Sequence, residues 1–575
     1  MERGIGTSRG IGIGHVLIVY NASAVVNRET NYNAEEEKKR FFEARKTFIE
    51  QTEELLSELE KKLGESDKDA LVLKNQIYLA RDITTENEVV AAIENSHICA
   101  EAAFDDVCNK LIQLFSSMDN PDMQQRVTDI QDMRERMIQI LQGTKAFDLT
   151  NLPDNTVIVA DEIKPSMTAS MDIAHVAGIV AEKGGDTAHA SILARALEIP
   201  AVLSVKGILQ KVKNGDSIII DGAYGEVFIN PTQRTFSIYE KKKKRYEEHI
   251  EELKTFINKS TETADGKKVM LAANIGGADE AAKAVKAGAE GVGLFRTEFL
   301  FLNKNALPTE EEQFEEYKKA AVLTKGMPLT IRTLDIGGDK DIPYMGLTKE
   351  ANPFLGYRAI RFCLDRVDIF TTQLRAILRA SAYGSIRIMI PMITSVNEVR
   401  QVKELIKKIC SDLDRNGINY DKNIQTGVMI ETPAAAVMAD VIAQEADFFS
   451  IGTNDLTQYT IAVDRCNENV AYLYSAFNPA VLRLIRRIIE CAHNAGIEAG
   501  MCGEAAANAL MAPILLSFGL DEFSVSTGKV LETRKTIADW TLKEAGLVTD
   551  KVMSMATEKE VTDYLSDYIS ERNKK

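Results

Sequence analysis

Apolar residues spaced for helices dominate the chain between residues 25 and 145. One stretch, 34–64, carries them at intervals of seven and four positions, which suits one helical face: Phe41, Phe48, Leu55 and Leu59. Further stretches with helical spacing are 69–82, 86–118 and 121–143, the last opening with a proline and closing at a glycine. The pattern predicts an all-helical bundle of about four helices over 25–145, inserted into another domain.

Short β-rich runs flank this helical region. The glycine-broken stretch 10–20 is expected to form a first strand, and similar runs resume after the insert at 155–163, 176–184, 199–205 and 217–230. The pattern predicts a compact α/β domain made of residues 1–24 and 146–232.

The remainder of the chain alternates strands and helices. A charged stretch, 233–261, is predicted to be a linker helix. Beyond it, eight β-like runs recur near residues 270, 293, 332, 388, 428, 450, 500 and 524. They are continuously apolar, as strands covered on both faces are, and helical stretches separate them. Eight such units over 262–575 predict a (β/α)₈ TIM barrel, so the fold class is multidomain α/β.

Composition narrows the function classes. The chain has 575 residues, more than one hydrophobic core usually organises, and a formal net charge of −16. That charge disfavours nucleic acid and would attract a basic protein partner. The one basic run, within 241–254, is followed at once by acids and is typical of a solvated helix. The seven cysteines are scattered and include no CxxC pair, which is typical of a reducing compartment. The sequence also shows no signal-peptide pattern and no apolar membrane span, so we expect a cytoplasmic protein.

Polar residues end several barrel runs, at the edge where such barrels carry their active sites. They are Arg296, Arg332, Glu431, Asn454, Asp455 and Cys502, with Arg465 in a following loop. Any one arginine is more often a surface ion pair, but a series at successive strand ends favours a site. Guanidinium groups bind phosphate and carboxylate, whereas carboxylates beside an anion are expected to hold Mg²⁺. Cys502 is either a buried structural thiol or a proton donor.

A histidine in "KGGDTAHASILAR" (183–195) differs from the other five. Thr187 is a favourable N-cap, which places His189 in the first turn of a helix, where negative charge is stabilised. Arg195 lies in the same helix, and a pair of glycines precedes that helix. An ordinary histidine near a helix cap has the same pattern. The alternative is an imidazole that accepts a phosphoryl group.

Seven segments together resemble the enzyme I family of the bacterial sugar phosphotransferase system. They are "GGDTAHASILARALEIPAV", "EGVGLFRTEFLF", "IRTLDIGGDK", "NPFLGYRAIR", "GVMIETPAA", "FFSIGTNDLTQYTIAVDR" and "GMCGE". The resemblance covers essentially the whole chain. It implies that phosphoenolpyruvate binds the barrel with Mg²⁺ and phosphorylates a histidine in a swivelling α/β domain. The phosphoryl group then passes to the carrier HPr, which docks on the helical insert, and pyruvate is released.

The resemblance also implies roles for individual residues. His189 matches the phosphohistidine, with Thr168 and Arg195 as its neighbours. Arg296, Arg332, Asn454 and Arg465 match the phosphoenolpyruvate contacts, Glu431 and Asp455 the metal ligands, and Cys502 the residue that protonates the enolate carbon. The family forms a homodimer through the barrel.

Some positions depart from the family pattern. Asp186 stands where the family often has Arg, and Ala188 where it usually has Ser. Gln76 replaces a common His in the insert, and "MCGEAAAN" varies from "MCGE-x-A-GD". The changes near His189 and Cys502 bear on rate, and Gln76 bears on the identity of the carrier.

Two other functions fit parts of the pattern. A relative of pyruvate phosphate dikinase or phosphoenolpyruvate synthase would share the histidine domain and barrel, but only about 20 residues precede the helical insert and no nucleotide-binding module is visible. A phosphoenolpyruvate-sensing regulatory paralogue would show erosion at the barrel mouth, where the arginines and carboxylates are all present.

Overall fold

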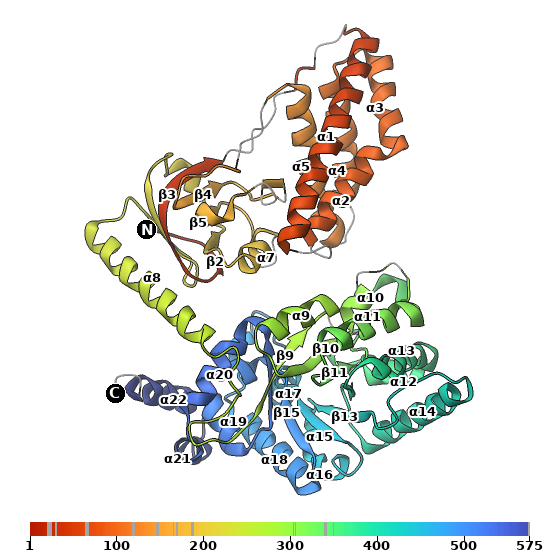
Figure 1. Ribbon diagram of the computed structural model, residues 1–575, viewed down its shortest axis with the longest axis vertical. Coiled ribbons are helices and arrows are strands. Elements are labelled where there is room, and N and C mark those ends of the chain that lie inside the picture. Colours follow the sequence, from red (N-terminus) through yellow and green to blue (C-terminus); the bar gives the residue numbers. More distant parts are fainter. Residues whose placement is uncertain are drawn as a thin grey trace. The chain divides into compact units, whose positions relative to one another are not determined.

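The computed structural model describes residues 1–19, 26–28, 32–63, 68–117, 121–144, 149–164, 166–167, 171–185, 189–302, 304, 306–337, 342–348 and 350–572. The chain forms two compact units, residues 1–250 and 251–575 (Figure 1). Among the described helices, none has the length and apolar character needed to cross a bilayer.

The first unit contains an eight-stranded mixed sheet in the order β1-β8-β7-β3-β4-β5-β6-β2. The strand predicted at 10–20 is confirmed as β3, which is central, antiparallel to β7 and parallel to β4. It is the third strand and not the first, because two short strands precede it. Neighbouring residues of β4 face opposite apolar clusters, Val157 one and Ile158 the other, because side chains alternate along a strand. The strands are β1 (Glu2–Arg3), β2 (Ile5–Ser8), β3 (Ile11–Val19), β4 (Thr156–Ala160), β5 (Val176–Ala181), β6 (Ala201–Leu203), β7 (Ser217–Asp221) and β8 (Glu226–Ile229).

Five helices between β3 and β4 pack side by side as a bundle (Figure 1). They are α1 (Ala34–Leu63), α2 (Lys68–Arg81), α3 (Ile83–Ser96), α4 (Ala100–Ser116) and α5 (Pro121–Leu141). The expectation of about four helices was one short, because stretch 86–118 is two helices. His97 adopts the left-handed conformation, with φ 49° and ψ 37°, and ends α3 with its N–H bonded to the Ile93 carbonyl. Phe41 and Phe48, expected on the inner face of the first helix, are buried.

The charged helix after the sheet, α8 (Gln233–Lys254), ends earlier than the sequence predicted. The carbonyls of Glu252, Leu253 and Lys254 accept from N–H groups three positions further on, as in tight turns. The buried Arg534 side chain bonds to the carbonyls of Phe256 and Ile257. The Arg534 Nη1 atom lies 2.9 Å from the Phe256 oxygen and 3.1 Å from the Ile257 oxygen. These contacts hold the segment in a non-helical path.

The second unit is a closed barrel of eight parallel strands with helices around it (Figure 1), which confirms the predicted TIM barrel. Its strands are β9 (Met270–Ile275), β10 (Gly291–Arg296), β11 (Leu329–Arg332), β12 (Ile386–Ile390), β13 (Gln425–Ile430), β14 (Phe448–Ile451), β15 (Glu498–Met501) and β16 (Glu522–Ser526). Each predicted run contains one of them.

The α-helices of this unit follow the strands in the order that the sequence predicts. They are α9 (Ala278–Lys286), α10 (Glu298–Leu302), α11 (Glu310–Leu323), α12 (Ile360–Asp365), α13 (Val367–Ala380), α14 (Val396–Arg415), α15 (Pro433–Val437), α16 (Ala439–Ile442), α17 (Thr453–Ile461), α18 (Pro479–Ala495), α19 (Ala512–Phe518), α20 (Val530–Asp539), α21 (Leu542–Met553) and α22 (Glu558–Arg572). The strands and helices share one apolar core, so the barrel rigidly positions the residues at its strand ends.

Candidate active site

A cavity of 370 Å³ opens at the carboxyl ends of the barrel strands. Arg296 and Arg332 are the last residues of β10 and β11, and Glu431 directly follows β13. All seven barrel residues singled out from the sequence line this cavity: Arg296, Arg332, Glu431, Asn454, Asp455, Arg465 and Cys502. The side chains at these strand ends therefore come together in space.

Arg332 lies at the centre of a buried charge network. Its Nη2 atom is 2.8 Å from Glu298 Oε1, and its Nη1 atom is 3.3 Å from Asp335 Oδ2. Burial lowers the pKa of Arg332, but the charges of Glu298 and Asp335 raise that pKa overall. Among the described residues, its buried Nε has no hydrogen-bond acceptor, so one donor of a fixed cation remains for an anion.

Arg358 is a second buried arginine of the site, which reasoning from strand ends missed. It forms a bidentate pair with Asp335, in which Nε donates to Oδ1 and Nη2 to Oδ2, each at 3.1 Å. Its Nη1 atom lies 3.4 Å from Asp455 Oδ1. It belongs to the segment "NPFLGYRAIR", so the family resemblance contained the signal for it. Gly337 allows the close approach, since its φ is +103° and an added Cβ would lie 2.6 Å from the Arg358 Cβ.

Among the carboxylates that line the same cavity, Glu431 and Asp455 fit a divalent cation. Glu431 is buried, and its Oε1 accepts a hydrogen bond of 2.6 Å from the Met392 backbone N–H. Burial, and then the neighbouring charges of Asp455 and Asp335, raise the pKa of Glu431 to about 8. A cation is the group that would stabilise these carboxylates in their charged form.

The backbone at Gly452 leaves room for Glu431. A Cβ there would lie 2.7 Å from Glu431 Oε2. Within the described ranges, no cluster of three or more His, Cys, Asp or Glu side chains is arranged to hold a metal ion by itself. A pair of carboxylates instead suits Mg²⁺, which commonly combines one or two carboxylates with water and substrate phosphate.

Cys502 immediately follows β15 and is buried beside the same cavity. Burial raises the pKa of its thiol to about 11, although Ser450 and Arg332 oppose that shift. The thiol therefore keeps its proton at neutral pH. Burial agrees with the first interpretation of Cys502, a structural thiol, and its place on the cavity wall adds the opportunity to donate that proton.

The histidine predicted to carry phosphate lies in the first unit. The helix α7 (His189–Ala196) has His189 in its first turn, as the sequence predicted, and Arg195 is exposed in its last turn. Arg195 follows His189 by six positions, which is about 9 Å of helical rise, so any joint contact with an anion relies on its long side chain. Thr168, Asp186, Thr187, Ala188 and the side chain of His189 lie outside the described residues.

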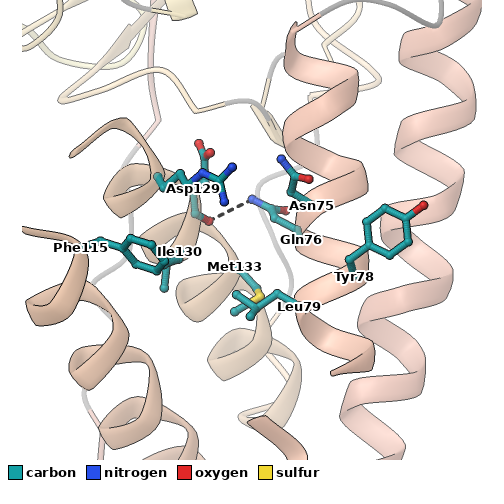
Figure 2. Close-up of a pocket in the computed structure, with 9 residues that line it drawn as sticks. Asn75, Gln76, Tyr78, Leu79, Phe115, Asp129, Ile130 and Met133 are labelled. Atoms are coloured by element: carbon teal, nitrogen blue, oxygen red, sulfur yellow. Dashed lines mark hydrogen bonds between the residues drawn. The ribbon is translucent and has the colours of Figure 1, made fainter. Parts of the chain in front are cut away.

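Gln76, the insert residue that departs from the family pattern, lies at a pocket between α2, α4 and α5 (Figure 2). Its Nε2 donates to the Asp129 carbonyl and to Asp132 Oδ2, both at 3.1 Å. Its Oε1 accepts from Arg136 at 3.2 Å. An amide is suited to this position because it donates and accepts at once, so Gln76 is part of the bundle's internal hydrogen bonding.

Three family models match successive parts of the chain. They are described as PEP-utilising enzyme, N-terminal (residues 3–126), mobile domain (152–225) and PEP-binding domain (250–542). The match to the PEP-binding domain alone covers half of the 575 residues. These matches define the class as the phosphoenolpyruvate-utilising enzymes.

Similar proteins narrow the class further. A protein of Bacillus sp. (strain S) is 43% identical over 562 residues, covering 98% of this chain and 97% of that protein. A protein of Bacillus subtilis (strain 168) is 41% identical over 565 residues, covering 98% of this chain and 99% of that protein. Both are named phosphoenolpyruvate-protein phosphotransferase, and the chain belongs to that family. The resemblance drawn from the sequence motifs is confirmed.

A solved structure also matches the chain in part. An NMR structure of an Enzyme I protein is 31% identical and covers 43% of this chain and all of its own, with a TM-score of 0.39.

Proposed function

We propose that this protein transfers the phosphoryl group of phosphoenolpyruvate to its own His189 and then to a histidine of HPr, releasing pyruvate. The observation that carries the proposal is the cavity at the barrel mouth, where arginines, carboxylates and a protonated thiol meet. An arginine-rich pocket matches a small anion with both a phosphoryl and a carboxylate group.

Each residue has a defined task in this proposal. Phosphoenolpyruvate is bound and oriented by four side chains: Arg296, Arg332, Arg465 and Asn454. Glu431 and Asp455 would hold Mg²⁺, which when bound offsets the negative charge of the substrate. The buried pairs with Glu298 and Asp335 fix Arg332 in place, so little reorganisation is needed when the anion enters.

The proposed reaction breaks the bond between phosphorus and the enol oxygen and forms a bond between phosphorus and an imidazole nitrogen of His189. The electron pair of the broken bond remains on the enolate. The Cys502 thiol then gives its proton to the terminal carbon, which yields pyruvate, and the thiolate regains a proton from solvent. Thr168 and Arg195 are proposed to stabilise the phosphorylated imidazole.

Partners follow from the same proposal. HPr is proposed to dock on the helical insert, 25–145, and the barrel, 262–575, to form a homodimer. Exposed apolar side chains on the second unit, including Leu355, Val437 and Val441, support an interface there. The linker, 233–261, is proposed to let the histidine domain, 1–24 with 146–232, alternate between barrel and carrier. We place the reaction in the cytoplasm, in keeping with the free cysteines of the described residues.

Labelled phosphoenolpyruvate tests the proposal against its alternatives. Acid-labile label on the protein without nucleotide supports the phosphotransferase. A requirement for nucleotide would favour a dikinase-like enzyme, and binding without labelling would favour a regulatory sensor.

Replacing Cys502 by Ala is expected to slow pyruvate release by roughly 10²–10⁴-fold, the usual contribution of a general acid. Binding of phosphoenolpyruvate should change little, because the thiol acts on the enolate. Pyruvate release and calorimetric binding measure the two effects. Cys410→Ala, in α14 away from the cavity, is the control. Unchanged pyruvate release in the Cys502 variant would leave only the structural role for this thiol.

Replacing Arg332 by Lys is expected to lower kcat/KM for phosphoenolpyruvate by roughly 10- to 150-fold, because an ammonium cannot reproduce a planar fork. That factor corresponds to a loss of about 1.5–3 kcal/mol of transition-state stabilisation. Steady-state kinetics measure this, with Arg400→Lys as the control, since that exposed residue pairs with Glu445 elsewhere. Thermal unfolding must show that the Arg332 variant remains folded. Native kinetics in a folded variant would contradict the assignment.

A further inference from the structure

We propose that Tyr474 is a positioning residue for phosphoenolpyruvate, holding Arg465 and Asn454 together at one wall of the cavity. The inference rests on the proposed function, in which those two residues contact the substrate. Tyr474 follows a short 3₁₀ turn, Ala471–Leu473, and lines the cavity itself.

The hydroxyl of Tyr474 touches both partners. It donates a hydrogen bond of 3.2 Å to the backbone carbonyl of Asn454. Burial raises the pKa of Tyr474, and the adjacent Arg465 guanidinium opposes that shift by its charge and by a hydrogen bond. The phenol therefore donates to the Asn454 carbonyl and lies beside the Arg465 guanidinium, which can donate to the lone pairs of the same oxygen.

Arg465 depends on such a contact because of where it lies. Its chain leaves α17 at Ala462, which adopts the left-handed conformation, and continues as a loop. The Arg465 backbone is fixed by a hydrogen bond of 3.2 Å to the buried side chain of Gln458. An arginine side chain has many rotamers, and each one that the Tyr474 contact excludes before binding lowers the entropy cost of capturing an anion.

Asn454 is fixed from its other side. It lies in the first turn of α17, and its Oδ1 accepts a hydrogen bond of 3.3 Å from the Glu504 backbone N–H, in the loop after β15. Tyr474 thus connects three separate pieces of the cavity wall: the start of α17, the loop of Arg465 and, through Asn454, the β15 loop. Its hydroxyl sets the spacing between the two proposed substrate contacts.

Tyr474→Phe removes only this hydroxyl. In the full chain we expect the KM for phosphoenolpyruvate to rise roughly tenfold, the loss of about one charge-assisted hydrogen bond, with kcat within about twofold of the native value. In a His189→Ala background, where no phosphoryl acceptor remains, calorimetry with phosphoenolpyruvate and Mg²⁺ should show the same rise in Kd. The melting temperature should stay that of the parent.

Tyr472→Phe is the matched control, because Tyr472 is two positions away and exposed. A Tyr474→Phe protein whose Kd equals that of the control would overturn the inference, as would an effect confined to kcat. Failure of the parent protein itself to bind phosphoenolpyruvate would instead refute the proposed function, so the two failures are distinguishable.

Discussion

Replacing His189 by Ala is expected to abolish incorporation of label from phosphoenolpyruvate completely. The imidazole is the proposed acceptor, and the phosphorylated intermediate cannot form without it. Binding of phosphoenolpyruvate should remain close to native, because the cavity and its arginines belong to the second unit, 251–575, and His189 to the first. Labelling and calorimetric binding on the same preparation measure the two effects.

The other histidines supply the control for this variant. His493 bonds to Asp521 at 2.9 Å on the barrel and does not line the cavity, so His493→Ala should incorporate label normally. Label that persists on an imidazole in the His189→Ala protein would show that another histidine is the acceptor. Loss of binding together with labelling would mean that His189 contributes to the substrate site.

Replacing Glu431 by Gln or Asp455 by Asn is expected to weaken Mg²⁺ and phosphoenolpyruvate together. The amides keep the size of each side chain but remove the charge that would hold the cation. Losing one charged contact costs about 1.5–3 kcal/mol, so each affinity should fall at least tenfold. The rise in melting temperature on adding Mg²⁺ with phosphoenolpyruvate measures the effect without turnover.

Glu404→Gln is the control for this pair, since Glu404 lies on α14 and pairs with Lys408 away from the cavity. It should respond to Mg²⁺ like the native protein. If both cavity variants keep native Mg²⁺-dependent stabilisation and turnover, these two carboxylates do not hold the cation. An effect on phosphoenolpyruvate alone would place them with the substrate contacts.

The sequence predicted those parts of the site that local patterns encode. Continuous apolar runs specify barrel strands, and a barrel brings the ends of its strands to one mouth, so residues at those ends could be chosen without coordinates. Arg358 was missed because it lies in the segment between β11 and α12, where no periodicity marks a position. Glu298 and Asp335 were missed because their role is to pair with arginines, a relation that only three-dimensional proximity defines.

The helix boundaries that differ from the sequence prediction have a similar origin. The break at His97 depends on one residue adopting a left-handed conformation, which its surroundings impose and its residue type does not announce. The early end of α8 depends on Arg534, far along the chain, whose guanidinium bonds to the carbonyls of Phe256 and Ile257. A tertiary contact accompanies each boundary: the Tyr32 N–H bonds to the His97 carbonyl at 3.1 Å, and Arg534 bonds to the segment after α8.

The most direct test of the central claim is to incubate the native full chain with phosphoenolpyruvate labelled in its phosphoryl group, with Mg²⁺ and without nucleotide. We expect acid-labile label on one histidine per chain, mapped to the peptide that contains His189, together with release of pyruvate. Absence of label, or label that appears only when ATP is added, would contradict the account.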